Sequence, residues 1–96
     1  MTNQAFPIIS DDRLVSPGLR RGRPESIWNQ PGRQAIAHPN VWIAIPKKFG
    51  ITNRLSDHGI RALAALARQT GKGSFEVGQY RNRGKNDYAI RFVPNG

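Results

Sequence analysis

Cysteine is absent from the sequence, which excludes disulfide bridges, thiolate-bound metals and a thiol nucleophile. Long hydrophobic runs are absent too, and no stretch approaches the ~18 apolar residues that cross a membrane. Residues 1–12 contain acids and a short apolar stretch, whereas a signal peptide begins with basic residues and a longer apolar core. We therefore expect a cytoplasmic protein with no membrane association, no metal and no cofactor.

Acidic residues are scarce. The 96 residues include 6 Asp and Glu against 15 Lys and Arg, which gives a formal net charge of +9. A balance this basic predicts a polyanionic partner, either duplex DNA or structured RNA, or else a larger acidic protein. Hydrophobic residues make up 38 %, below the usual level of about 45–50 %. A chain of this size buries a marginal core, which leaves homo-oligomerisation open.

The first part of the chain is rich in proline. Five of the seven prolines fall within residues 1–40, namely Pro7, Pro17, Pro24, Pro31 and Pro39. Because each proline removes an amide donor and disfavours helix at the preceding residue, we expect residues 1–40 to be an extended, partly disordered basic arm. Ile27 and Trp28 are too apolar for a plain linker, and we expect them to dock on the domain or on a protein partner.

Residues 41–96 show clear periodicity and predict a small α+β domain. The apolar residues alternate with period two in the strands and recur at i, i+3, i+4 and i+7 in the helix. The pattern predicts a strand at 41–45, a helix at 57–70, and hairpin strands at 74–81 and 87–93 joined by the loop 82–86. The predicted order is β-α-β-β, a three-stranded antiparallel sheet covered by one helix.

The end of the predicted hairpin is the most informative feature. Arg81, Arg83 and Lys85 fall within five residues, and Arg91 lies on the returning strand. A cationic loop at the end of a β-ribbon can follow a phosphate backbone or enter a groove, and Tyr80 could stack on bases. The alternative is a solvated hairpin end whose charges prevent edge-to-edge aggregation.

Other basic residues extend this candidate surface. Arg20-Arg21-Gly22-Arg23-Pro24 resembles the core of an AT-hook, a short motif that enters the minor groove of A·T-rich DNA. Arg61 and Arg68 share one face of the predicted helix. The full set of candidate nucleic-acid-binding residues is Arg20, Arg21, Arg23, Lys47, Lys48, Arg61, Arg68, Lys72, Tyr80, Arg81, Arg83, Lys85 and Arg91.

Catalytic patterns are few. His38 and His58 are the only histidines, and their spacing fits no metal site or catalytic pair. The segment Gly78-Gln79-Tyr80-Arg81-Asn82-Arg83, with Asp87, Tyr88 and Phe92, is similar to the sheet signature of bacterial toxin–antitoxin RNases that cut mRNA on the ribosome. That resemblance implies that Arg81, Arg83 and Tyr88 would stabilise phosphate and perform acid–base work. Such toxins begin with a strand and two helices, which this sequence does not predict, and we expect no enzymatic activity.

Three hypotheses for function follow. The first is a small non-catalytic nucleic-acid-binding protein, regulatory or accessory (for example in transcription), with DNA slightly preferred over RNA. The second is a protein-interaction module, such as a phage- or plasmid-type inhibitor or accessory factor that docks on a larger acidic protein. The third is a small ribosome-dependent RNase toxin.

Overall fold

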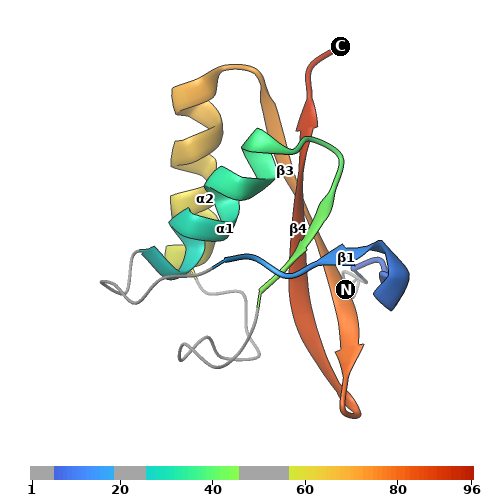
Figure 1. Ribbon diagram of the computed structural model, residues 1–96. Coiled ribbons are helices and arrows are strands. Elements are labelled where there is room, and N and C mark those ends of the chain that lie inside the picture. The colour runs from blue at the N-terminus through green and yellow to red at the C-terminus, as the bar shows by residue number, and fades with distance from the viewer. Residues whose placement is uncertain (1–5, 19–25, 46–56) are drawn as a thin grey trace, which may run out of the picture.

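The computed structural model describes residues 6–18, 26–45 and 57–96, which form a two-layer α+β arrangement (Figure 1). The described elements are the 3-10 helix η1 (Asp11–Arg13), the strands β1 (Leu14–Val15), β2 (Trp42–Ala44), β3 (Gly73–Asn82) and β4 (Lys85–Pro94), and the helices α1 (Ser26–Ala37) and α2 (Asp57–Thr70). The sheet order is β1-β2-β4-β3, with β1 parallel to β2 and the other pairs antiparallel. Neither described helix is long and apolar enough to cross a membrane.

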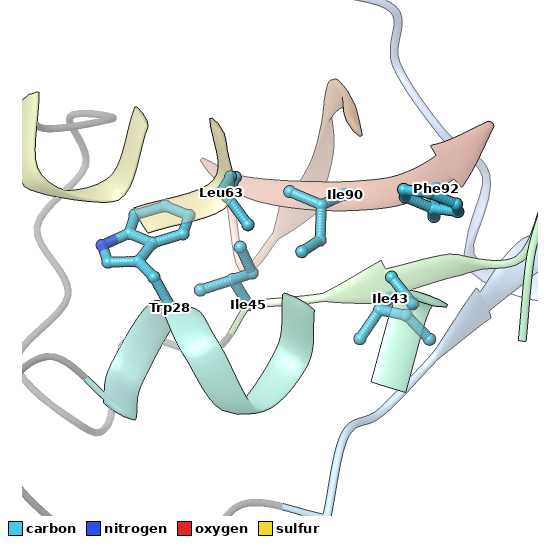
Figure 2. Close-up of a cluster of buried hydrophobic side chains, with 7 residues drawn as sticks. Trp28, Ile43, Ile45, Leu63, Ile90 and Phe92 are labelled. Atoms are coloured by element: carbon cyan, nitrogen blue, oxygen red, sulfur yellow. The ribbon is translucent and has the colours of Figure 1, made fainter. Parts of the chain in front are cut away.

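Both helices cover one face of the sheet, here called the helix face, and the main core lies between the two layers. Trp28 of α1 and Leu63 of α2 point toward Ile45 and Ile90 of the sheet (Figure 2). Alternate residues of each strand face the helices, as period two requires. Phe92 also lies in this cluster and packs edge-to-face against Phe75, with ring centroids 5.3 Å apart.

Two glycines set how closely the helices approach each other. A Cβ on Gly59 of α2 would lie 2.5 Å from the Trp28 ring, and a Cβ on Gly32 of α1 would lie 2.7 Å from the Leu66 side chain. Real Cβ atoms do not approach other atoms this closely. The absence of a side chain at these two positions therefore lets α1 and α2 pack directly against each other.

The opposite face of the sheet, here called the outer face, is covered by the segment that contains Ile9 and Leu14. Ile9 packs there with Trp42, Ala44, Tyr80 and Ala89. The same segment contacts both edges of the sheet: the N–H of Ile9 donates to the carbonyl of Gln79 in β3 at 2.7 Å, and Leu14–Val15 pair with β2. The outer face is therefore a second buried layer rather than an open surface.

The structure confirms the α+β class and corrects the predicted element count. Four strands and two helices replace the predicted three strands and one helix, because β1 and α1 form within the region expected to be extended. Pro31 lies inside α1 and is almost completely inaccessible to solvent. The proline removes one amide donor, but packing of Trp28 and Ala35 against the sheet stabilises the helix despite that loss. The helix predicted at 57–70 is confirmed as α2.

Candidate nucleic-acid interface

The β3–β4 hairpin projects beyond the rest of the fold. Its two strands pair continuously from Gly73↔Pro94 to Asn82↔Lys85. β2 pairs with β4 only at Ala89 and Ile90, and Pro7–Ile9 bond to β3 only at Gln79. In the described residues no other strand pairs with residues 81–86, which we call the tip. Figure 1 shows this end of the hairpin extending past the helices.

A two-residue turn closes the hairpin. Arg83 and Gly84 both have positive φ, 54° and 81°, which is the conformation of a type I′ turn. This turn matches the right-handed twist of the strands, so the ribbon stays paired to its end. The predicted five-residue loop over 82–86 is wrong, because Asn82 and Lys85 form the last strand pair. Arginine is an unusual residue at a left-handed position, where glycine, asparagine or aspartate is favoured.

Three cationic side chains surround the tip. Arg81, Arg83 and Lys85 are all exposed, and the segment 81–86 contains no acidic residue. Strand alternation places Arg81 on the helix face, Lys85 on the outer face and Arg83 at the apex. Nη1 of Arg81 donates to Oδ1 of Asn86 at 3.3 Å, which orients that guanidinium without neutralising it.

The buried carboxylate of Asp87 is hydrogen-bonded to the tip at the point where the exposed segment begins. Asp87 is only 2 % exposed, and its Oδ2 accepts a hydrogen bond from Nδ2 of Asn82 at 2.9 Å. Tyr80 lies directly opposite Asp87 across the ladder, and its hydroxyl donates to the carbonyl of Ile45 at 3.5 Å. Burial raises the pKa of Tyr80, and the nearby charges of Asp87 and Asp11 raise it further. These contacts hold Tyr80 and Asp87, the last buried pair of the hairpin before the exposed tip. The tip therefore extends from a well-packed base.

Two residues predicted to contact nucleic acid make contacts within the fold. Tyr80 is 8 % exposed within the outer-face cluster, so its ring is not available for stacking on bases. The guanidinium of Arg91 lies 4.9 Å from the centroid of the Trp42 ring, and its Nη2 forms a 2.9 Å ion pair with Oε2 of Glu76. Arg91 therefore stabilises the outer face, and its charge is compensated there.

Tyr88, which the RNase resemblance singled out, is also buried. Its ring packs edge-to-face against Phe6, with centroids 5.8 Å apart. The three residues carried by that resemblance therefore do not form one exposed cluster, because Arg81 and Arg83 lie at the solvent-exposed tip while Tyr88 lies below it.

The remaining candidates are separated from the tip or lie outside the described residues. Lys72 precedes β3, at the opposite end of that strand, which spans about 33 Å at the usual rise. Arg61 and Arg68 are exposed on α2. Trp28 lies in the helix-face core rather than at a surface. Five candidates lie outside the described ranges, namely Arg20, Arg21, Arg23, Lys47 and Lys48. The side chain of Ile27 is not described either.

Asn82 and Asp87 are part of the RNase-like resemblance, which assigns no role to either, although their hydrogen bond supports the tip. The signal was present in the strand alternation: Asp87 has the same parity as Ala89, so it points to the outer face and meets Tyr80 once the register is known. Finding the Tyr80–Asp87 pair required the two-residue turn, because a five-residue loop over 82–86 leaves Asn82 unpaired and places Asp87 opposite Arg81.

Within the described ranges, no group of three or more His, Asp or Glu side chains could hold a metal ion. Comparison of the chain with protein-family models, with curated proteins and with solved structures found no match.

Proposed function

We propose that this protein binds nucleic acid without catalysing a reaction, and that the hairpin tip is its contact surface. Duplex DNA is the favoured partner. The observation that carries the proposal is the tip itself: a paired ribbon that projects from the fold and presents Arg81, Arg83 and Lys85 on an exposed segment, 81–86, that contains no acidic residue. A formal net charge of +9 supports attraction to a polyanion over the whole molecule.

The geometry of the ribbon suits a DNA groove. A major groove about 12 Å wide admits a two-stranded β-ribbon, whereas the major groove of an RNA helix is too narrow. Because Arg81 and Lys85 lie on opposite faces of the ribbon, an inserted tip offers one cation toward each phosphate strand. Arg83 at the apex supplies a third cation for the phosphates that border the groove.

The backbone conformation of Arg83 supports the same proposal. Arginine in this left-handed conformation costs free energy relative to asparagine or glycine, which the turn favours. The arginine therefore contributes something other than turn stability. In our proposal that contribution is the positive charge at the apex.

The test is a fluorescence-anisotropy titration of labelled duplex DNA, single-stranded DNA and structured RNA at 50, 100 and 200 mM salt. The tip variant is Arg81→Ala/Arg83→Ala/Lys85→Ala. Loss of three phosphate contacts lowers duplex affinity on the order of 100-fold at 100 mM salt and flattens the slope of log K against log salt by about 2.7.

The control variant is Arg61→Ala/Arg68→Ala/Lys72→Ala, which removes three charges from α2 and the turn that follows it. Both variants lower the net charge equally, so a long-range effect of charge reduces binding to the same extent in each. We expect the control to lose only a few-fold in affinity, since exposed charges beyond a Debye length are largely screened. Equal losses in the two variants, or no binding of the wild type to any polymer at 50 mM salt, would contradict the proposal.

A further inference from the structure

An apolar groove lies between α2 and β3 on the helix face, away from the tip. Its volume is about 340 Å³, and its lining is almost entirely apolar. We call this surface the α2–β3 groove; it is lined chiefly by Ile60, Leu63, Ala64 and Ala67 of α2 with Phe75 and Val77 of β3. Ile60 is 50 % exposed, so the groove presents apolar surface to solvent.

The strand beside this groove has an open edge. The N–H and carbonyl of Gln79 point away from β4, because they bond to the carbonyl of Pro7 and the N–H of Ile9. Backbone groups of alternate residues in a strand point the same way, so those of Val77 and Phe75 also face outward. No strand within the described ranges pairs with them. Pro7 lacks an N–H, so it cannot donate to the carbonyl of Val77.

Cations flank the same groove. Arg61 and Arg68 lie one helical turn to either side of Ala64, on its solvent side. Both are exposed, and neither forms an ion pair with a residue that the structure describes. A helix rise of 1.5 Å places them about 10 Å apart along the axis. Among the residues that the structure describes, the groove therefore combines an apolar floor, backbone groups without a strand partner and two positive charges without an ion pair.

From this combination we infer that the α2–β3 groove binds an extended segment of a partner protein, which adds as a strand to β3. The segment carries apolar side chains toward the groove and acidic side chains toward Arg61 and Arg68. Strand addition supplies backbone hydrogen bonds, and the alternate side chains supply selectivity. A second copy of this chain fits poorly, because it would bring the same two arginines and a net charge of +9 to the contact.

The probe is a labelled nine-residue peptide with threonine at every even position and valine, glutamate, valine, glutamate and valine at the odd positions. Strand alternation directs all the odd side chains to the groove, with the two glutamates about 13 Å apart. A matched peptide has lysine in place of glutamate. We expect the wild-type protein to bind the glutamate peptide about tenfold more tightly than the lysine peptide.

Charge reversal is the decisive variant. In Arg61→Glu/Arg68→Glu we expect the preference to invert, so that the lysine peptide binds more tightly. Ala64→Trp fills the groove from an exposed position and abolishes binding of both peptides, whereas Gln69→Trp, exposed and outside the lining, leaves binding unchanged. In the wild type, the amides of Phe75 and Val77 exchange more slowly with solvent when the glutamate peptide is bound.

Several outcomes would overturn this inference. Undetectable peptide binding at millimolar concentration is one, and a preference that ignores the charge reversal is another. Sedimentation that shows a dimer broken by Ala64→Trp would assign the groove to a second copy instead. The tip variant Arg81→Ala/Arg83→Ala/Lys85→Ala retains peptide binding under this inference, so failure of the peptide experiment is distinct from failure of DNA binding.

Discussion

The tip of the hairpin and the solvent side of α2 are both cationic, but their surroundings differ. Arg81, Arg83 and Lys85 stand on a polar ribbon with no apolar surface beside them. Arg61 and Arg68 border an apolar groove and an open strand edge. The comparison shows that positive charge alone does not identify a partner. A bare cationic ribbon suits a polymer of phosphates, and cations beside apolar surface suit an acidic protein segment.

The largest effect that separates the two regions is the response to salt. Binding of duplex DNA through the tip releases counterions, and three phosphate contacts alone reduce affinity about 40-fold between 50 and 200 mM salt. Binding of the glutamate peptide rests partly on apolar contact and backbone hydrogen bonds, so it weakens only a few-fold over that range. Parallel titrations of duplex DNA and of the glutamate peptide at 50 and 200 mM salt measure this. Equally steep salt dependence for both ligands would contradict the proposed difference between the two regions.

The next effect concerns the hydrogen bond between Asn82 and Asp87 at the base of the tip. In Asp87→Ala the amide of Asn82 loses its buried acceptor, and we expect unfolding to require about 1–3 kcal/mol less free energy. Thermal unfolding followed by circular dichroism measures the change. DNA affinity falls with it, because the cations lose their rigid base, while peptide binding at the groove persists at 20 °C. The control is Asn86→Ala, a substitution at the exposed residue that precedes Asp87. It should alter the free energy of unfolding by under about 0.5 kcal/mol.

A smaller effect tests the apex. Asparagine favours the left-handed conformation of position 83, so Arg83→Asn should increase stability by about 0.5–1 kcal/mol. Removal of one phosphate contact lowers DNA affinity about five- to tenfold at 100 mM salt. Denaturant unfolding and anisotropy on the same sample give both numbers. If stability and affinity both decreased, the arginine would be part of the fold rather than of the interface.

The smallest effect is a pH dependence at the base of the ribbon. Burial raises the pKa of Tyr80 in the folded protein, with Asp87 and Asp11 adding to the shift. The stability that the neutral phenol contributes is therefore fully present below the unfolded pKa of about 10 and is lost as pH rises through the folded value. Wild type should lose more stability than Tyr80→Phe between pH 9 and pH 11, as measured by urea unfolding. Identical losses would mean that Tyr80 makes no contribution to alkaline sensitivity.

The sequence was most informative for elements whose hydrophobic periodicity is visible within their own residues. The apolar stripe through Leu63 and Ala67 located α2, and the alternation around Ile90 located the hairpin strands. Prediction failed for α1, because Pro31 interrupts its local hydrogen bonding and its stability comes from packing against α2 and the sheet. β1 is a two-residue strand whose existence depends on β2, so no period could reveal it.

The candidate site shows the same division. The three cations of the tip were found because they are neighbours in the sequence. The burial of Tyr80 has a tertiary cause that the sequence does not reveal: the outer face of the sheet is covered by Ile9 and its neighbours. Register placed Asp87 beneath the tip, and the α2–β3 groove depends on how the edge of β3 lies against α2.

The segment that covers the outer face also affects the order of folding. Ile8 bridges Gln79, and Leu14–Val15 pair with β2, which itself pairs with β4, so the sheet is built from strands far apart in the sequence. Among the described strand pairs, the β3–β4 hairpin is the one whose two strands are neighbours in the sequence. A topology dominated by such distant contacts folds in milliseconds to seconds rather than microseconds, because loop closure precedes any gain from pairing. The hairpin that carries the proposed interface is thus the part of the sheet that can form first.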